Sequence, residues 1–553
     1  MDTQRLILIL IFSFSAFMLI EAWQRESRGP VSPTAESKSQ KSSTDKSSTD
    51  ATPKPSVKLE LPGSPGTSTA DQNKAGPTEL VRVTTDVLAV DIDTAGATLV
   101  RVELIRHRAT GDIKKNFVLL DPAHSYSAQS GLIGEGLPNH HSRFEVSAKE
   151  FSLRDGEQRL EVRFESRAAD GVVVSKILTF ERSSYLVKLR QEVQNNGTVA
   201  VEPHGYYQLV RDGNPPEGDS KMLPTYTGVA VYNVQDKYQK VSFEDITKGK
   251  TPYSKTAEDG WVGIVQHYFV AAWIAPGKVI REFYTKSLDN DLYAAGVIVP
   301  LGKVEPGAVA NQAVALYVGP QDQDKLRTIA DGLDLTVDYG WLTVIAVPLF
   351  WVLKTFHAWV GNWGVAIILL TVLIKLLFYP LSAASYRSMA KMRVLAPKLQ
   401  RLKEQYGNDR QRMQQAMMEL YKTEKINPLG GCLPIVVQIP VFIALYWVLL
   451  ASFELRQAPF MLWIQDLAAT DPYYILPVLM GATMVIQSRL NPEPPDPVQA
   501  KLMKIMPIAF SIFFFFFPAG LVLYWLVNNI LSIAQQWHIT RGLERAVAAH
   551  GKR

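Results

Sequence analysis

Cysteine is almost absent from this chain of 553 residues, because Cys432 is the one example. A single cysteine excludes an intramolecular disulfide, although it does not decide on which side of a membrane the chain folds. Cys432 begins an apolar run and is interpreted as a small buried residue. The net charge is also low, +5 at pH 7, which argues against nucleic-acid binding except where basic residues cluster.

Two kinds of functional group are missing as well. No Gly-x4-Gly-Lys-Ser/Thr sequence occurs, so nothing indicates nucleotide hydrolysis and no bound cofactor is expected. The apolar segments after residue 360 contain no aspartate or glutamate near their middles. A proton-coupled carrier normally needs an acidic side chain within the membrane, so this class is disfavoured.

The beginning of the chain reads as an anchor followed by a linker. Arg5 precedes the apolar stretch Leu6–Ile20, and no convincing small-residue cleavage site follows it. We therefore expect residues 1–23 to form an uncleaved signal anchor with a cytoplasmic N-terminus; a cleaved signal peptide is the alternative. Residues 24–79 are rich in Ser, Thr, Pro and Lys and predict a flexible linker.

Short alternating runs dominate residues 80–340. In Tyr185–Val193 one face carries Val187, Leu189 and Val193, and the other carries Lys188, Arg190 and Glu192. This is the period of a half-buried strand, and its recurrence predicts a large external all-β domain, a sandwich.

Two turn signals separate such runs. Asn196-Gly197 and Asp155-Gly156 are dipeptides that suit tight hairpins, and we expect them to join paired strands.

Long apolar segments gather after residue 340. Their number, together with the anchor, predicts a polytopic α-helical membrane core attached to the β domain. The segment 341–360 has the length of a span, yet it contains Pro348, Lys354 and His357 and is rich in tryptophan. The remaining candidate spans are residues 361–381, 431–451, 472–488, 504–517 and 519–538.

Charge asymmetry orders these segments across the membrane. The loop 382–430 contains ten Lys and Arg against four Asp and Glu, whereas the loop 452–471 has Arg456 as its one basic residue. The positive-inside tendency places the first loop and the basic tail 541–553 in the cytoplasm and the second loop outside. One span may then separate the β domain from loop 382–430. We therefore expect 341–360 to lie along the outer interface and the chain to have six spans.

One charge lies near the middle of a span. Lys375 would cost roughly 3 kcal/mol in lipid unless it meets water or a partner, or reaches the cytoplasmic surface along its own side chain. Thr371 lies four residues earlier on the same helix face, and Gln438 lies in the next span. In the last span Tyr524, Asn528, Ser532 and Gln535 form a polar stripe, with Trp525 and Asn529 beside it. Each alone suits helix–helix hydrogen bonding, but together with a lysine they favour a hydrated, positive cavity.

The cytoplasmic loop has two runs with a three–four rhythm, separated by Gly407-Asn408-Asp409. The runs are Met392, Leu395, Leu399, Leu402 and Tyr406, and then Met413, Met417 and Leu420. They predict a short antiparallel helical hairpin, with a kink at Pro397. Its methionines offer an adaptable apolar surface, and its basic charge suits anionic lipids or ribosomal RNA.

Seven motifs in the membrane region resemble the YidC insertases of Gram-negative bacteria. They are Tyr379-Pro-Leu381, Ser388-Met-Ala-Lys-Met392, Asn427-Pro-Leu-Gly-Gly-Cys432, Gln438-Ile-Pro440, Glu454-Leu-Arg-Gln-Ala-Pro459, Asp471-Pro-Tyr-Tyr-Ile-Leu-Pro477 and Pro518-Ala-Gly-Leu-Val-Leu-Tyr-Trp525. The resemblance covers the whole membrane region in order. It implies an insertase core over residues 361–540 and an outer β-super-sandwich similar to sugar mutarotases.

The resemblance also implies a groove open to the cytoplasm and to lipid, closed on the outside. The family's groove arginine corresponds here to Lys375, which keeps the charge but loses the bidentate fork. The candidate groove residues are Lys375, Thr371, Gln438, Tyr524, Trp525, Asn528 and Ser532. The candidate contacts for clients or the ribosome are Met392, Arg393, Lys398, Arg401, Arg410 and Met417.

The hypothesis is that the hairpin receives a client segment, the groove takes its polar tail near Lys375, and the client helix slides along 431–451 and 504–517 into lipid. Expected partners are nascent membrane proteins, the Sec translocon with its accessory subunits, the ribosome, the signal recognition particle receptor and anionic lipids. The expected location is the bacterial inner membrane, with both termini cytoplasmic and the β domain periplasmic.

Three alternatives stay open. A sugar-converting enzyme would use histidines of the outer domain, which are scattered at positions 107, 124, 140, 141, 204 and 267. A small-solute channel would use Lys375 as an anion site. A chaperone or Sec accessory would assist clients without inserting them alone.

Overall fold

The computed structural model describes residues 79–168, 170–216, 225–406, 409–424, 433–490 and 497–550. They fall into two compact units, one ending at Val337 and the other beginning at Asp338. The signal anchor expected over 1–23 and nearly all of the linker expected over 24–79 lie outside the described residues. So do Gly407, Asn408 and Cys432.

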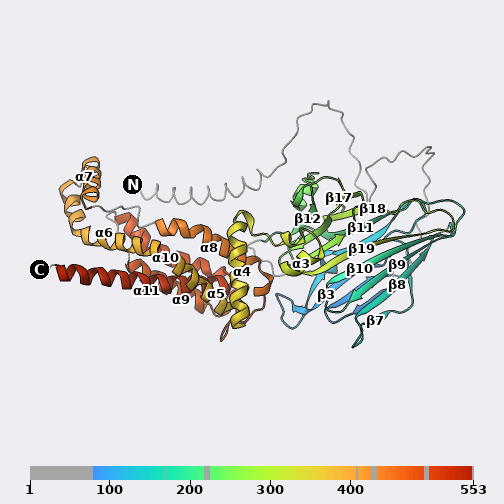
Figure 1. The fold of residues 1–553 in the computed structure, drawn as a ribbon, viewed down its shortest axis with the longest axis horizontal. Helices are drawn as coiled ribbons and strands as arrows, with labels where there is room; N and C mark the ends of the chain where they lie inside the picture. The colour runs from blue at the N-terminus through green and yellow to red at the C-terminus, as the bar shows by residue number, and fades with distance from the viewer. Residues whose placement is uncertain are drawn as a thin grey trace, which may run out of the picture. The chain divides into compact units, whose positions relative to one another are not determined.

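The first unit is a sandwich of two sheets (Figure 1). The first sheet has the order β14 (Thr256–Ala257), β17 (Arg281–Ser287), β18 (Leu292–Pro300), β11 (His204–Asp212), β5 (Ser127–Ile133), β3 (Thr98–Arg108), β2 (Leu88–Asp93), β1 (Leu80–Thr84) and β7 (Glu150–Ser152), with β4 (Asn116–Leu120) beside β3. The second has the order β13 (Lys237–Val241), β12 (Gly228–Asn233), β15 (Trp261–Gln266), β16 (Phe269–Ile274), β19 (Val309–Pro320), β10 (Leu186–Asn195), β9 (Val172–Glu181), β8 (Arg159–Arg167) and β6 (Glu145–Val146). The large β-sandwich expected from the alternation is confirmed.

Strand β10 shows why the pattern forms a sandwich strand. Val187, Leu189 and Val193 are buried, while Lys188 and Arg190 are exposed, as the period of two requires. The strand pairs with β9 and β19 on its two sides. Short helices complete the unit: η1 (Pro122–His124), α2 (Phe243–Thr247), α3 (Gln323–Ile329) and η2 (Leu333–Thr336).

The expectation that Asn196-Gly197 and Asp155-Gly156 join paired strands is wrong. Strand β10 pairs with β9 and β19 but not with β11, which follows it, and β7 pairs with β1 rather than with β8. Asp155-Gly156 makes a turn, with a φ of 91° at Gly156, whereas Asn196-Gly197 leads into a bend. Turn chemistry is a local property, whereas strand pairing depends on which apolar faces meet in the core.

Polar side chains connect the two sheets through the core. The Tyr207 hydroxyl of β11 donates to Gln191 Oε1 of β10 at 2.8 Å, and the indole nitrogen of Trp273 donates to the carbonyl of Gln208 at 3.1 Å. Both aromatic side chains are fully buried. Because buried polar groups are costly unless hydrogen-bonded, these contacts favour one alignment of the sheets.

A fully buried lysine lies between the sheets, and its hydrogen-bond partners are neutral oxygens. Lys176 Nζ of β9 donates to the carbonyls of Gly96 at 2.6 Å and Ser130 at 2.7 Å, and to Ser130 Oγ at 2.9 Å. The Phe144 ring centroid lies 4.7 Å away. Burial disfavours the charged form and lowers the pKa of Lys176 to about 7.

Lys176 should therefore make the stability of the β unit depend on pH. Above about pH 7 the folded unit has released a proton that unfolded Lys176, with a pKa of 10.5, still holds. The free energy of unfolding should then rise by up to about 1.4 kcal/mol per pH unit between pH 7 and 10.5. Below pH 7 the folded unit bears the full cost of burying the charge. Hydrogen-exchange mass spectrometry of β9 in the full-length protein measures this.

Lys176→Met is the control, because comparing both proteins at the same pH cancels the intrinsic exchange rate. We expect the variant to lack the rise in this window. An equal rise in the variant would show that Lys176 is not its source.

The second unit is helical. Its elements are η3 (Gly340–Leu342), α4 (Thr343–Val360), α5 (Trp363–Leu377), α6 (Tyr379–Tyr406), α7 (Arg410–Thr423), α8 (Leu433–Ala451), η5 (Phe453–Leu455), α9 (Ile475–Leu490), α10 (Pro497–Phe513), η6 (Phe514–Phe516) and α11 (Ala519–His550). Helix α11 packs against α5, α6 and α9, and α10 packs against α9. Figure 1 shows α4 running across the direction that α5 and α11 share.

A two-residue turn produces the change of direction between α4 and α5. Gly361 ends α4 with a φ of 66°, and its N–H donates to the His357 carbonyl at 2.7 Å. Asn362 then caps α5, because its side-chain oxygen accepts from the Val365 N–H at 3.0 Å. Glycine tolerates the left-handed conformation and asparagine is a favoured N-cap, so this dipeptide stops one helix and starts the next.

Helices α5 and α6 meet at a bend of 66°. Pro380 lies at the start of α6, where it cannot donate the backbone hydrogen bond that would continue α5. Pro397 lies within α6, which runs from Tyr379 to Tyr406, and the kink expected there stays a prediction. The sharp change of direction therefore belongs to the Tyr379-Pro-Leu381 motif.

Length and hydropathy together select few of these helices. Among the described residues Gly340–Val360 is long and apolar enough to cross a membrane, and Trp363–Leu377 with Tyr379–Met392 qualifies as one bent pair. Val437–Ala451, Ile475–Leu490 and Met503–Phe516 are apolar but shorter. By length and hydropathy, α4 is therefore the first candidate for a membrane span. It covers the segment 341–360, which we expected along the outer membrane interface.

Candidate functional site

Lys375 lies on α5 facing α11. Its half-buried ammonium donates a hydrogen bond of 2.8 Å to Ser532 Oγ. The Ser532 hydroxyl in turn donates to the backbone carbonyl of Asn528 at 2.7 Å. Among the described side chains no carboxylate lies within ion-pair distance of Lys375, so a positive charge is satisfied here by neutral oxygen.

The polar contacts continue to a third helix. Gln438 of α8 donates from Nε2 to Asn528 Oδ1 at 2.8 Å. Asn528 therefore accepts from Ser532 through its backbone and from Gln438 through its side chain. Lys375, Ser532, Asn528 and Gln438, which we call the polar chain, connect α5, α11 and α8. The stripe expected from spacing on α11 is thus brought against both Lys375 and Gln438.

Three other predicted groove residues lie outside the polar chain. Thr371 is buried, and its hydroxyl donates to the Ile367 carbonyl of its own helix at 2.7 Å. Tyr524 is buried, and Gln438 lies within hydrogen-bonding reach of its hydroxyl. Trp525 packs edge-on to Phe442 at 4.0 Å between centroids and touches Phe514, so it belongs to an aromatic cluster.

Sequence reasoning missed two polar contacts of α11. Tyr386 of α6 lies within hydrogen-bonding reach of Ser532, on the side where α6 bends away from α5. Asn529 faces α9 instead, and its Nδ2 donates to Thr483 Oγ1 at 3.4 Å. Tyr386 lies seven residues after Tyr379 and therefore on the same helix face. This spacing could have indicated that Tyr386 also faces α11.

The segment 452–474, which we call the closing loop, crosses the ends where α5, α9 and α11 begin. Asn362 Nδ2 donates to the Phe460 carbonyl at 2.9 Å, and the ring of Phe460 lies against Gly364, where a Cβ would come within 2.0 Å of it. At the start of α11 the Gly520 N–H donates to the Leu467 carbonyl at 2.9 Å. The loop therefore ties the first turns of helices that carry the polar chain.

Asp471 is the buried anion of the closing loop. Its Oδ1 accepts from the Trp463 indole and from the Tyr473 N–H, both at 3.0 Å, and its Oδ2 accepts from the Leu476 N–H at 2.7 Å. These contacts satisfy free donors at the start of α9 and fix Trp463. They give a physical role to the aspartate that opens the motif Asp471–Pro477.

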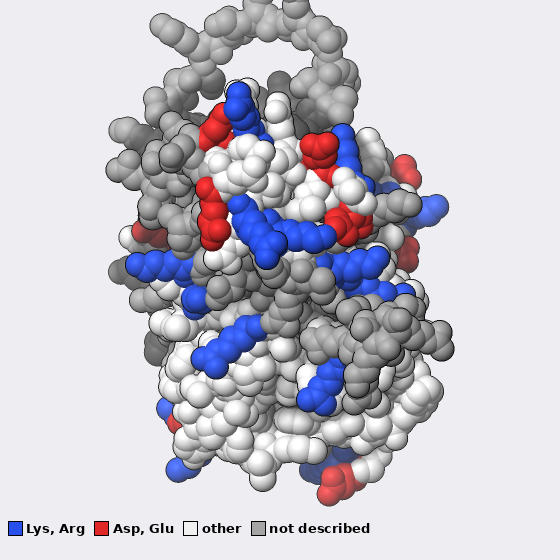
Figure 2. Space-filling model, turned by 90° about the vertical axis from the view of Figure 1, so that its left-hand side faces the viewer, with Lys and Arg blue, Asp and Glu red and all other residues white. Residues whose placement is uncertain are grey.

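The described part of loop 382–430 contains most of α6 and all of α7. Helices α6 and α7 pack together, and Asp409 caps α7 by accepting from the Gln411 and Arg412 N–H groups. Met392 and Met417 are half-buried, whereas Met418 is 55% exposed. Figure 2 looks onto the end of the helical unit that carries α6 and α7, where Lys and Arg gather with Asp and Glu.

The basic residues predicted on the hairpin differ in surroundings. Lys398 makes an ion pair of 2.6 Å with Glu424, which links the two helices. Arg401 is exposed. The side chains of Arg393 and Arg410 lie outside the described part of the structure, so their predicted contacts are untested.

The histidines of the β unit make separate contacts. His107 bonds the Tyr185 hydroxyl at 2.8 Å, His140 bonds the Tyr206 hydroxyl at 2.5 Å, and the rings of His267 and Tyr268 stack. Among the described residues no three His, Cys, Asp or Glu side chains are placed to hold a metal ion.

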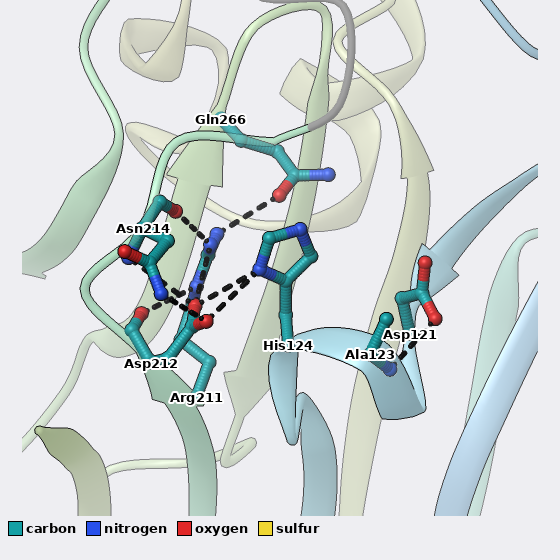
Figure 3. A network of polar contacts seen from close by, with 7 residues as sticks. All are labelled: Asp121, Ala123, His124, Arg211, Asp212, Asn214 and Gln266. Carbon is teal, nitrogen blue, oxygen red and sulfur yellow. Dashed lines mark hydrogen bonds and ion pairs between the residues drawn. The ribbon is translucent and has the colours of Figure 1, made fainter. Parts of the chain in front are cut away.

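His124 pairs with a carboxylate: its Nδ1 lies 3.1 Å from both side-chain oxygens of Asp212 (Figure 3). Arg211, 1% exposed, donates to Gln266 Oε1 at 3.1 Å and to the Asn214 carbonyl at 2.6 Å. Burial alone would raise the pKa of Asp212, but hydrogen bonds from Asn214 and His124 outweigh it and lower the pKa. The network joins η1, β11 and the end of β15, which is a structural role.

Two family models cover most of the chain. The YidC periplasmic domain matches residues 80–352, and the 60Kd inner membrane protein matches residues 355–546. The chain belongs to the YidC family of membrane protein insertases. Membership places it in the bacterial inner membrane.

Relatives in this family align along their whole length. The membrane protein insertase YidC of Methylobacillus flagellatus is 56% identical over 551 residues, covering 99% of each chain. That of Nitrosospira multiformis is 53% identical, covering 100% of this chain and 99% of its own. These YidC proteins are named as insertases rather than as enzymes.

Solved structures give weaker similarities. A crystal structure of an active YidC insertase has a TM-score of 0.38 at 17% identity, covering 83% of this chain and 94% of its own. A galactose mutarotase related enzyme from Lactobacillus acidophilus has a TM-score of 0.29 at 11% identity, covering 43% of this chain and 97% of its own.

We expect Asp471→Asn to loosen the closing loop. An asparagine keeps one acceptor oxygen where the carboxylate offers two, so either the Trp463 or the Leu476 donor loses its partner, at a cost of about 1–2 kcal/mol. Hydrogen exchange at residues 463–476 should accelerate by roughly five- to thirtyfold as a result. Asp322→Asn, which changes the cap of α3, is the control and should leave this region unaffected; no change in Asp471→Asn would contradict the role.

Proposed function

We propose that this YidC family member inserts membrane proteins through a groove lined by the polar chain. The observation that carries the proposal is the half-buried Lys375 ammonium, which has a neutral hydroxyl as its partner. A lysine within a bundle is costly, and one hydrogen bond offsets part of that cost. A client segment with a carboxylate would add an opposite charge, worth up to about 4 kcal/mol at an effective dielectric constant of 20.

The apolar surface beside the groove supports the second half of the proposal. Val437 and Ile439 of α8 and Ile508 and Ile512 of α10 are exposed large apolar side chains. A client helix that leaves the groove would move along these faces into lipid. Apolar burial and the membrane potential would drive the step without a cofactor.

We further propose six spans, with α4 on the outer surface rather than across the membrane. Helix α4 buries Ala346, Phe350 and Leu353 on the bundle and exposes Trp351 and Trp359. Its direction across α5 and its exposed tryptophans suit an interfacial helix better than a span. The closing loop then lies outside and the α6–α7 hairpin lies in the cytoplasm.

The hairpin is the proposed first contact for clients and their delivery partners. Exposed Met418 and Arg401 offer an adaptable apolar surface beside positive charge. Nascent chains, the ribosome, anionic lipids and the Sec translocon are the proposed partners of this surface and of the core. A small-solute channel remains the second candidate for the Lys375 site, and anion conductance of reconstituted protein would reveal it.

Charge at position 375 should decide insertion. We expect liposomes with wild-type protein or Lys375→Arg to insert a small single-span client with an acidic tail. Lys375→Glu should lower the initial rate at least about tenfold, about 1.4 kcal/mol, because like charges repel in the groove. Protease protection of the client measures the rate.

Lys375→Ala tests whether charge or size matters, since it removes the ammonium without adding an acid. A neutral client tail is the matched control, and it should reduce the difference between the variants. Equal insertion by all four proteins would remove Lys375 from the mechanism. No insertion by any folded protein would favour a Sec accessory or chaperone.

The topology can be tested with single cysteines. In a Cys432→Ser background, we expect Thr470→Cys to react with an impermeant maleimide in intact spheroplasts. Met418→Cys should react only after the membrane is permeabilised, because the hairpin lies on the other side. Labelling of both positions, or of Met418→Cys alone, in intact spheroplasts would overturn the arrangement.

A further inference from the structure

The closing loop ends in a tight apolar turn. The Phe460 N–H donates to the Ile464 carbonyl and the Ile464 N–H donates to the Met461 carbonyl, both at 3.0 Å. At the apex the side chains of Met461 and Leu462 are 55% and 79% exposed. We call Met461 and Leu462 the loop tip.

The backbone of the loop tip makes this exposure unusual. Leu462 has a φ of 53°, a left-handed conformation that favours glycine or asparagine. A leucine there strains the backbone, and its exposed side chain gains no burial within the chain. Because both effects are unfavourable in water, the leucine must be explained by an apolar environment outside the protein.

The loop tip is held rigidly against the bundle. Phe460, which precedes it, packs on Gly364 and is bonded through its carbonyl to Asn362. Trp463, which follows it, is bonded to Asp471. The tip therefore stays level with the first turn of α5.

The length of α5 determines how deep in the membrane its first turn, and with it the loop tip, lies. Helix α5 has 15 residues, so it extends about 22 Å, whereas the hydrocarbon core of a bilayer is about 30 Å thick. If the bend after Leu377 lies at the cytoplasmic boundary, the first turn of α5 lies below the outer boundary. An apolar tip beside that turn would meet acyl chains rather than water.

The helical unit also exposes side chains of the kind found at a membrane boundary. Tyr473 and Tyr474, just before α9, are exposed, as are Trp351 and Trp359 on α4. Tyrosine and tryptophan are enriched where a bilayer meets water. Tyr473 is linked to the loop tip through Asp471, which accepts from the Tyr473 N–H and from the indole of Trp463.

We propose that Met461 and Leu462 insert into the outer leaflet as a lipid anchor, which fixes the depth of the closing loop and of the groove helices tied to it. The proposal rests on the topology given above but does not depend on how clients are inserted. Its occupant is lipid; contact with another protein is a different outcome of the test.

The test places an environment-sensitive NBD label at Leu462→Cys, in the full-length Cys432→Ser protein reconstituted into nanodiscs of phosphatidylethanolamine and phosphatidylglycerol. Both faces of a nanodisc are open to aqueous quenchers. The matched control is Thr470→Cys, an exposed polar position of the same loop. Met461→Cys repeats the measurement in case the label at Leu462 disturbs the turn.

We expect blue-shifted emission at position 462, with strong quenching by doxyl lipids and protection from iodide, and the reverse at position 470. Iodide quenching at both tip positions without doxyl quenching would overturn the proposal. Protection from both quenchers would also overturn it and would assign the tip to a protein contact. Since no client is present, these results stand apart from any failure of insertion, and the maleimide experiment tests the topology separately.

Discussion

A lysine inside a bundle of apolar helices must reach water or give its hydrogen bonds to oxygen atoms nearby. Lys375 does the second through Ser532, and the arrangement of the groove helices follows from that contact. The serine must face α5, which fixes the rotation of α11, and Asn528 one turn earlier then faces Gln438 of α8. The neutral partner leaves a net positive charge, and this separates the site from a structural salt bridge.

The closing loop makes this arrangement reproducible. The loop holds the starts of α5 and α11: the Asn362 side chain donates to the Phe460 carbonyl, and the Ala519 and Gly520 N–H groups donate to the carbonyls of Ala469 and Leu467. Asp471 adds the cap of α9 and the bond to Trp463. Because these contacts hold the helix ends, the loop restricts the rotation of α5 and α11 relative to each other.

The β unit follows different rules. Its buried cations, Lys176 and Arg211, donate to carbonyl, hydroxyl and amide oxygens and hold strands and turns together. His107 and His140 bond tyrosines, and His124 bonds Asp212. The β unit is thus stabilised by polar contacts within its own core.

Much of the architecture could be read from the sequence, because it depends on local patterns. Period-two burial in Val187, Leu189 and Val193 indicated the sandwich, and the spacing of Asn528 and Ser532 indicated a polar face on α11. Strand pairing could not be read: Asn196-Gly197 suits a hairpin, but β10 pairs with β9 and β19 rather than with β11. The bend of 66° between α5 and α6 was missed as well, because the apolar run 361–381 continues across it.

The sequence by itself determined the family, the β and helical regions, and the presence of one lysine among polar residues in the membrane region. Tertiary structure decided that Ser532 rather than Thr371 binds Lys375, that Trp525 joins an aromatic cluster, and that Asp471 holds the closing loop. The reason is physical: residue type and period are properties of a single segment. Which groups hydrogen-bond depends on the rotation and depth of several helices packed together, and no single segment contains that information.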